Sequence, residues 1–284
     1  MSTRALCVGI NLFKNYPQST LHGCVNDAHD MASVLKAYLG FKDADISLLT
    51  DAQATKQNIM SHLKTMVADA KAGRLNYLVF SMSSHGTQVP DRNGDEPDKA
   101  DEAFCPYDLA QSGNQWDLNH LIVDDELHDL FVTLPSNVLL EVYLDTCHSG
   151  TGLKAIDLMV DREPRFIPPP SFEAFAQIEG RQSRGLAMRM RQKDLVHHIL
   201  WGACRDSQTS ADANISGSYH GAFTYYFCKE LRACKNSLSR AALLKKIAAD
   251  LAAGHYNQVP QLECEATVRS REPGQVPAQA LTHA

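Results

Sequence analysis

The sequence predicts an α/β protein in which helices cover both faces of a mostly parallel sheet. Two observations lead to this prediction. Segments with the apolar content of strands alternate along the chain with segments whose apolar residues recur at helical spacing. In addition, Asn76–Ser83 and Val138–Asp145 are almost continuously apolar, which is typical of parallel strands that are buried on both faces.

The predicted elements follow one another from the N-terminus. Strands are expected at Arg4–Asn11, Asp45–Thr50, Asn76–Ser83, Val138–Asp145, His197–Cys204 and Gln261–Cys264. Helices are expected at Ala28–Leu39, after Thr55, at Asp124–Leu134, at Ala222–Ala233 and at Ser239–Ala253. Asn26 or Asp27 stands in the position to cap the N-terminus of the first helix.

The alternation indicates a single domain over residues 1–270, with a C-terminal tail over 271–284. Asp91–Asp108 holds seven acidic and two basic residues together with Gly and Pro, and is predicted to be a loop. Leu153–Asp194 has four prolines and little periodicity. Segments of this length without pattern are usually functional or disordered, so residues 153–195 are expected to form a linker or activation segment.

Composition argues against several classes of partner. The formal net charge of −6 over 284 residues does not favour binding to nucleic acid or to an anionic membrane. No stretch approaches the roughly 20 apolar residues of a membrane span, and the N-terminus lacks the pattern of a secretory signal. The eight cysteines are scattered without a CxxC pair, which favours reduced thiols in a cytoplasmic protein over disulfides or a zinc site.

Reactive side chains follow the two most apolar strands. His85 and Gly86 come shortly after the first of them, and Cys147 directly follows the second. Ligands of open α/β sheets bind beyond the carboxyl ends of the strands, so the imidazole and the thiol meet there if the strands are neighbours. An imidazole ionises a thiol into a nucleophile, and the N–H groups of Gly86 and Cys147 are candidate donors to an oxyanion. Taken one by one, the two residues also have structural explanations. Cys147 could be a small buried core residue, and His85 with Gly86 could be part of a turn.

Several motifs, in order along residues 4 to 264, resemble those of the metacaspases, the caspase-like cysteine peptidases. The matching segments are Leu21–Ala28, Ser84–Gln88, Asp91–Asp108, Asp124–Glu126, Asp145–Gly150, Cys204–Ala211, His220–Thr224 and Asn257–Leu262. Ser84 departs from the pattern, because the family usually has Gly there. The resemblance implies a caspase-type fold with a six-stranded sheet, a Cys147–His85 dyad, and cleavage of proteins or peptides after Arg or Lys.

The resemblance also implies a specificity pocket formed by Cys24, Asp27, Ser83 and Asp145. Two carboxylates in a narrow pocket would hold a guanidinium or ammonium group through charge-assisted hydrogen bonds. The structural alternatives are a helix cap for Asp27 and a strand-end turn for Asp145.

Calcium activation is common in the family, and its ligands correspond to Asp101, Asp124 and Asp125. Carboxylate oxygens suit calcium. Lys154, however, stands where the family has a further acid, and a cation there opposes metal binding. Calcium dependence is therefore left open.

The segment after Cys147 corresponds to the region that caspase relatives cleave in themselves or lay across the active site. Its run from Arg181 to Lys193 offers five bases that an acidic pocket would accept: Arg181, Arg184, Arg189, Arg191 and Lys193. The alternative is a surface loop whose charges keep it soluble.

Two other functions compete with the cysteine endopeptidase. A caspase-fold pseudoenzyme acting as a binding or scaffold module would fit if Ser84 crowds the base. A metal-dependent hydrolase built on the acidic loop is weaker, because no His/Asp cluster of known geometry accompanies that loop. The resemblance implies a monomer.

Overall fold

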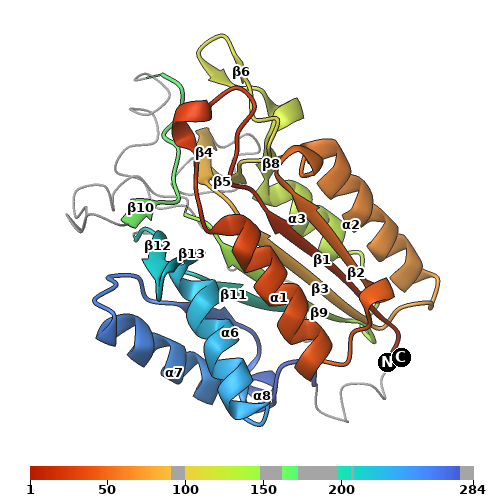
Figure 1. The fold of residues 1–284 in the computed structure, drawn as a ribbon. Helices are drawn as coiled ribbons and strands as arrows, with labels where there is room; N and C mark the ends of the chain where they lie inside the picture. Colours follow the sequence, from red (N-terminus) through yellow and green to blue (C-terminus); the bar gives the residue numbers. More distant parts are fainter. Residues whose placement is uncertain (91–99, 148–161, 172–197, 206–207, 276–284) are drawn as a thin grey trace.

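The computed structural model describes residues 1–90, 100–147, 162–171, 198–205 and 208–275, and its centre is a six-stranded sheet (Figure 1). The strands lie in the order β14-β11-β9-β3-β1-β2, and β14, at one edge, runs antiparallel to its neighbour. Their bounds are Thr3–Gly9 (β1), Ile46–Thr50 (β2), Tyr77–Ser83 (β3), Leu139–Asp145 (β9), His198–Gly202 (β11) and Gln261–Glu263 (β14). The predicted fold class is confirmed, and every strand of this sheet lies at a predicted position.

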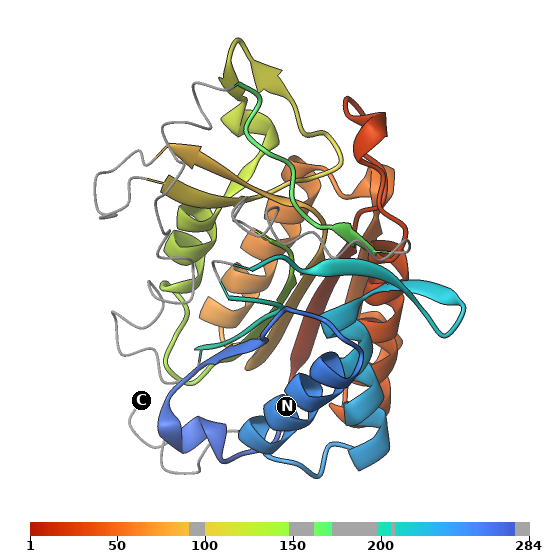
Figure 2. The same cartoon turned by 90° about the vertical axis from the view of Figure 1, so that its left-hand side faces the viewer.

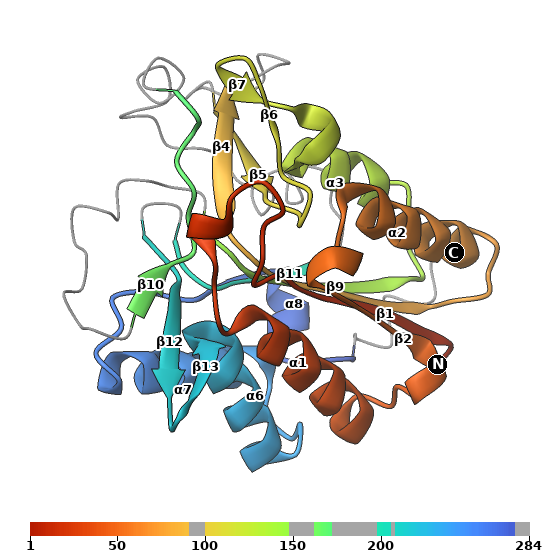
Figure 3. The same ribbon diagram turned by 45° about the horizontal axis from the view of Figure 1, so that its top comes forward.

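Helices cover the two faces of the sheet as separate layers (Figure 3). One layer contains α2 and α3, and the other contains α1, α6, α7 and the short α8. The bounds are Cys24–Tyr38 (α1), Lys56–Lys71 (α2), Asp124–Phe131 (α3), Ala222–Cys234 (α6), Arg240–Ala253 (α7) and Ala266–Arg269 (α8). Short 3₁₀ turns occur at Pro17–Ser19, Asp43–Asp45, Asp51–Gln53 and Leu118–His120.

The two helical layers use alternate residues of the same strands. In β3, Leu78, Phe80 and Met82 pack in the core with α2 and α3, whereas Tyr77 and Val79 pack in the core with α1, α6 and α7. Side chains of successive strand residues point to opposite faces, so a strand covered on both sides must be apolar at nearly every position. This explains why the central strands have no polar face in the sequence.

The start of α1 differs from the prediction. The helix begins at Cys24 with Gly23 as its N-cap residue, so the assignment of Asn26 or Asp27 as the cap is wrong. Asp27 instead lies in the first turn of the helix and is almost fully buried. Its carboxylate therefore does not cap the helix and can contact residues near the carboxyl ends of the central strands.

Small antiparallel sheets border the carboxyl ends of the central strands. They contain Gly86–Pro90 (β4), Ala100–Phe104 (β5) and Ile122–Val123 (β8); Arg162–Pro164 (β10), Ala211–Ile215 (β12) and Ser218–Gly221 (β13); and Gln111–Ser112 (β6) with Gln115–Trp116 (β7). The prediction of a loop throughout Asp91–Asp108 is wrong for β5. That strand pairs with β4 and buries Ala103 and Phe104 although it also carries Asp101 and Glu102.

Residues 162–171 lie across this end of the molecule. In Figure 2 the segment, in green, runs from β12 towards the neighbourhood of β4. β10 pairs antiparallel with β12, and Phe166 forms a parallel bridge with Gly86. The segment therefore passes directly over the ends of β3 and β9, where the predicted catalytic residues lie.

Candidate active site

His85 and Cys147 leave the central sheet side by side. β3 and β9 are parallel neighbours with Ser83 opposite Asp145, so each of the two residues follows its strand by the same number of positions. Their exposed fractions are only 5% for His85 and 0% for Cys147. The strand pairing thus places the predicted base and nucleophile at the same end of the sheet, beyond the carboxyl ends of two neighbouring parallel strands.

The imidazole of His85 is held by a backbone carbonyl. Its Nε2 lies 2.9 Å from the carbonyl oxygen of Ser19, and since a carbonyl can only accept, Nε2 carries a proton. Burial lowers the pKa of His85 from 6.5 to about 4, against a smaller opposing effect of the bond to Ser19. The ring is therefore neutral near pH 7. Nδ1, which is buried without a hydrogen-bond partner among the described residues, keeps a lone pair that can accept a proton.

Ser84, the residue that departs from the family pattern, is bonded to the backbone. Its hydroxyl donates to the carbonyl oxygen of Cys105 at 2.7 Å, and the residue is fully buried. The side chain therefore has a structural partner next to the site, and the hydrogen bond does not involve the base.

The sulfur of Cys147 faces the residues that follow β11. Sγ lies 3.2 Å from Sγ of Cys204 and 3.2 Å from the carbonyl oxygen of Gln208, and the N–H of Ser210 donates to it. In the part of the chain that the structure describes, this sulfur makes no hydrogen bond to His85.

Two backbone N–H groups converge on the carbonyl oxygen of Arg165. The N–H of Gly86 donates to it at 2.9 Å and that of Cys147 at 3.3 Å. These are the two donors that the sequence suggested for an oxyanion. Fixed N–H groups of this kind stabilise the charge that develops on a carbonyl oxygen under nucleophilic attack.

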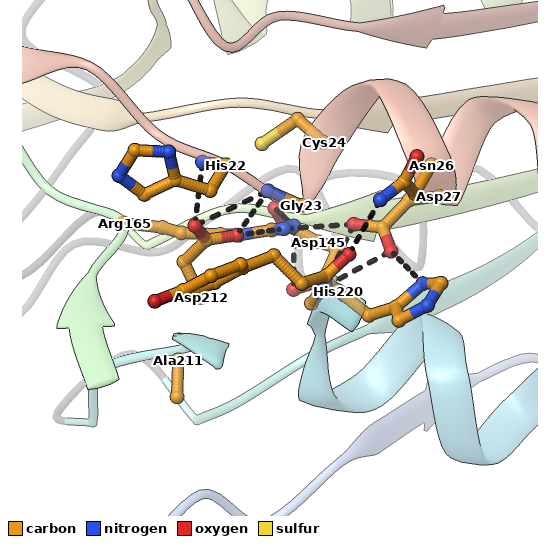
Figure 4. A network of polar contacts seen from close by, with 12 residues as sticks. His22, Gly23, Cys24, Asn26, Asp27, Asp145, Arg165, Ala211, Asp212 and His220 are labelled. Atoms are coloured by element: carbon orange, nitrogen blue, oxygen red, sulfur yellow. Dashed lines mark hydrogen bonds and ion pairs between the residues drawn. The ribbon is translucent and has the colours of Figure 1, made fainter. Parts of the chain in front are cut away.

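The side chain of Arg165 is completely buried among three carboxylates (Figure 4). Its Nη2 lies 2.7 Å from Asp27 and 2.8 Å from Asp212, and its Nη1 lies 3.3 Å from Oδ1 of Asp145. Nη1 also donates to the backbone carbonyl of Asp145 at 3.1 Å. Asp27 and Asp145, the two acids predicted for the pocket, thus contact an arginine of the same chain, and Asp212 adds a third carboxylate. Their role in selecting a substrate stays a prediction.

Backbone and hydroxyl donors hold the three carboxylates in place. Asp145 accepts from the N–H and hydroxyl of Thr224, Asp27 from the N–H of Gly221, and Asp212 from the N–H of Gly23. Burial raises the pKa of Asp27, although the neighbouring guanidinium opposes the shift. A side chain at position 221 has no room, because a Cβ there would lie 2.3 Å from Asp145 and 2.4 Å from the Arg165 guanidinium.

Comparison with known proteins identifies the family. A family model described as metacaspase, peptidase C14 domain, matches residues 3–156, which is more than half of the chain. The chain belongs to the metacaspase family. It is 34% identical to Metacaspase-1A of Aspergillus fumigatus, over 92% of this chain and 68% of that protein. It is 33% identical to Metacaspase-1 of Ajellomyces capsulatus, over 92% of this chain and 79% of that protein. Membership makes this metacaspase a cysteine-type endopeptidase, and its substrates proteins or peptides.

Solved structures show the same fold. The chain resembles protein GSU0716 of Geobacter sulfurreducens with a TM-score of 0.66 and 26% identity, over 97% of this chain and 99% of the other. It also resembles caspase-1 of Spodoptera frugiperda with a TM-score of 0.57 and 13% identity, over 93% and 88% of the two chains. The second likeness concerns the fold alone. Within the described part of this metacaspase, no helix has the length and hydrophobicity needed to cross a bilayer.

The other two residues predicted for the pocket, Cys24 and Ser83, are buried at its border. Cys24 begins α1 and Ser83 ends β3. Burial raises the pKa of the Cys24 thiol well above its usual value, and the positive charge of Arg165 opposes the shift. Neither side chain is hydrogen-bonded to Arg165 in the part of the chain described.

The predicted calcium ligands come from adjoining elements. Asp101 lies on β5, and Asp124 and Asp125 begin α3 directly after β8, which pairs with β5. Their carboxylates are the kind of donor that calcium prefers. No group of three or more His, Cys, Asp or Glu side chains able to hold a metal occurs within the described residues. Lys154 lies outside them, and the calcium site stays a prediction.

Sequence reasoning missed Arg165, Asp212 and Ser19. Asp212 directly follows the family-like segment Cys204–Ala211, but no local feature of the sequence marks it as a residue of the pocket. Arg165 lies within the predicted activation segment, but no local feature marks it among the basic residues there. The five bases predicted as self-processing sites, between Arg181 and Lys193, lie outside the described residues.

Proposed function

We propose that this metacaspase cleaves peptide bonds after Arg or Lys, with Cys147 as nucleophile and His85 as base. The pose of Arg165 carries the proposal. Its side chain occupies the acidic pocket while its carbonyl oxygen accepts hydrogen bonds from Gly86 and Cys147. A residue held at both ends in this way has the position of the residue before a scissile bond.

The charge of the pocket supports the preference for a basic residue. Three carboxylates surround the guanidinium, so an acidic side chain in the same place would meet repulsion and find no positive partner in the set of contacts described. Arg fits the arrangement better than Lys, because its planar fork reaches Asp27 and Asp212 with one nitrogen and Asp145 with another.

The chemical steps follow from the groups around the carbonyl. Nδ1 of His85 takes the proton of the Cys147 thiol, and the thiolate attacks the carbonyl carbon of the residue in the pocket. The N–H groups of Gly86 and Cys147 hold the negative oxygen. The peptide C–N bond then breaks, His85 returns the proton to the leaving amine, and water hydrolyses the thioester. Before attack, Sγ must turn away from Cys204 and Gln208, a rotation about one side-chain bond.

The same pose makes the Arg165–Phe166 bond the proposed site of self-processing. This bond lies within the predicted activation segment, and the N–H of Ile167, on its far side, donates to the carbonyl of Gly86 at 3.0 Å. The backbone is therefore fixed before and after the bond. While Arg165 fills the pocket, no other basic side chain can enter, so the uncut chain would act poorly on other substrates.

Calcium activation, a cytoplasmic location and a monomeric state complete the proposal. Calcium would be held by Asp101, Asp124 and Asp125. All eight cysteines are free thiols, which suits a reducing compartment. No chemical step above depends on the metal.

The test is hydrolysis of short fluorogenic peptides that end in Arg, Lys or Asp by wild type and Cys147→Ala, each with calcium and with a chelator. We expect cleavage after Arg and Lys that is lost in Cys147→Ala, and a new N-terminus at Phe166 in the wild type alone. The chelator arm decides whether calcium is required.

Other outcomes contradict separate parts of the proposal. Cleavage after Asp would retain the nucleophile and refute the role of the pocket carboxylates. Folded protein that cleaves no peptide under any condition would favour the pseudoenzyme, with Arg165 as a permanent plug in a binding module.

A further inference from the structure

A second arginine of the same segment, Arg162, occupies a site of its own. Its Nη1 donates to the carbonyl oxygen of His255 and its Nη2 to that of Gly254, each at 2.7 Å. The guanidinium carbon also lies 3.9 Å from the centroid of the Tyr256 ring. Among the described residues, two acceptors and one aromatic face bind this planar cation, and all three contacts suit a guanidinium.

The two carbonyl acceptors lie at the C-cap of α7 and on the residue directly after it. Gly254 is the C-cap residue of this helix, and His255 follows it with a φ of 57°. The last carbonyls of a helix have no partner within the helix and carry its partial negative charge, so they attract cations. The site is also built around its aromatic residues, because a Cβ at position 254 would lie 2.8 Å from both the Tyr226 hydroxyl and the Tyr256 ring.

The backbone of the segment fixes how far this site lies from the cleaved bond. β10 pairs with β12 so that Arg162 is opposite Ala213 and Pro164 is opposite Ala211. The register continues at Arg165, whose N–H donates to the carbonyl of Ser210 at 3.1 Å. A peptide that binds β12 in this register and fills the acidic pocket must therefore place the residue three positions earlier beside Tyr256.

We propose that Tyr256 and the carbonyl oxygens of Gly254 and His255 form a second substrate subsite, which selects an arginine three residues before the arginine at the cleaved bond. Preferred substrates then contain Arg-Xaa-Xaa-Arg, as the segment Arg162–Arg165 itself does. The inference rests on the proposed function, since it assumes that peptides bind as this segment does. Arg is favoured over Lys because an ammonium group cannot donate to both carbonyls while lying flat on the ring.

Three fluorogenic peptides with the sequence of this segment test the subsite: acetyl-Arg-Glu-Pro-Arg, acetyl-Lys-Glu-Pro-Arg and acetyl-Ala-Glu-Pro-Arg, each with a C-terminal coumarin amide. With wild-type enzyme we expect kcat/KM to be about tenfold higher for the Arg peptide than for the Ala peptide, with the Lys peptide between them. All three end in Arg, so cleavage of the Ala peptide tests the proposed function separately. No cleavage of any peptide would overturn the proposed function, whereas equal cleavage of the Arg and Ala peptides would overturn only the subsite.

Two substitutions of Tyr256 test whether the preference for an arginine three residues before the arginine at the cleaved bond arises at this subsite. Tyr256→Leu removes the aromatic face and should lower the ratio of kcat/KM for the Arg peptide to kcat/KM for the Ala peptide about two- to fivefold. Tyr256→Phe keeps the ring and should keep the ratio. An Arg preference that is undiminished in Tyr256→Leu would place the selection elsewhere and refute this subsite.

The full chain gives an independent measure. Arg162→Ala should slow cleavage at the Arg165–Phe166 bond about tenfold. Glu163→Ala is the matched control, because its side chain is exposed on the same strand, and should leave the rate within about twofold. Equal rates for the two variants would contradict the proposal.

Discussion

Arg165 and Arg240 are both fully buried arginines bound to carboxylates, but their surroundings differ in charge. Arg165 faces three carboxylates, those of Asp27, Asp145 and Asp212. Among the described residues, Arg240 is paired with one carboxylate, that of Glu141. Its other acceptors there are neutral backbone carbonyls, those of Val268, Arg271 and Gln275.

The two sites also differ in what they connect. Glu141 lies in the middle of β9, and it accepts further bonds from Tyr143 and from the N–H of Gly274. The pair with Arg240 therefore ties α7 and residues near the C-terminus to the sheet. Arg165 reaches its carboxylates from the predicted activation segment and also presents a peptide bond to Gly86 and Cys147.

We propose that this difference in charge separates a structural ion pair, that of Arg240, from a substrate-binding site, that of Arg165. The charges of Arg240 and Glu141 neutralise each other, so the departure of either side chain would leave the other buried without a counter-charge. Three carboxylates around one cation retain excess negative charge, and they would remain buried without a counter-charge if that cation departed. Such a site favours the entry of another cation, which is what a peptidase pocket for basic residues requires.

The largest expected effect follows from removing the cation that is proposed to be exchangeable. Arg165→Gln leaves the three carboxylates without their cationic partner in the cleaved segment. We expect the rate of cleavage at the following bond to fall about 10⁴-fold, because a site built to hydrogen-bond a polar group rejects a substrate that lacks that group. Arg165→Lys keeps the charge and should retain cleavage within about tenfold. Timed electrophoresis and intact mass of the products measure both. Cleavage of the Gln variant at an undiminished rate would show that the pocket does not select the residue.

The next effect concerns stability. Glu141→Gln leaves Arg240 buried without a counter-charge, and we expect the free energy of unfolding to fall by about 3–5 kcal/mol. Asp212→Asn removes the same charge from the three-carboxylate site and should cost only about 1 kcal/mol, because Arg165 keeps Asp27 and Asp145. Urea unfolding of both variants in a Cys147→Ala background, where the chain stays intact, measures the difference. Equal losses would mean that the two sites do not differ in charge balance.

The central fold could be predicted because its determinants are local. The strands of the main sheet are short apolar runs, and the long helices show apolar spacing with boundaries that differ from the prediction by a few residues. The small sheets could not be predicted in this way. β5 contains Asp101 and Glu102 and reads as a charged loop, yet pairing with β4 buries it. Strands whose residues are polar acquire their structure from partners distant in the sequence, which periodicity does not report.

The site divides in the same manner. His85 and Cys147 follow recognisable strands, so their placement at neighbouring strand ends was predictable once parallel neighbours were assumed. The role of Asp212 could not be predicted, because its contacts with Gly23 join residues 189 positions apart. The role of Arg165 could not be predicted either, because the pairing of β10 with β12 decides which basic residue of the segment enters the pocket. Composition shows only that basic residues are present.

The smallest effect tests whether all three carboxylates contribute to binding a substrate. Asp212→Asn in otherwise wild-type enzyme should lower kcat/KM for peptides ending in Arg about 10- to 100-fold, since one charge-assisted hydrogen bond becomes a neutral one. Asp30→Asn is the matched control. Asp30 is another acid close to the pocket, but its carboxylate is paired with Arg232, and its loss should change the rate at most two- to threefold. Thermal unfolding of both variants ensures that folded enzymes are compared.

If Asp212→Asn and Asp30→Asn lower the rate equally, the effect is general electrostatic attraction, and the specificity pocket consists of Asp27 and Asp145 without Asp212. If only Asp212→Asn lowers it, the third carboxylate belongs to the specificity site, and the excess charge that distinguishes Arg165 from Arg240 serves substrate binding.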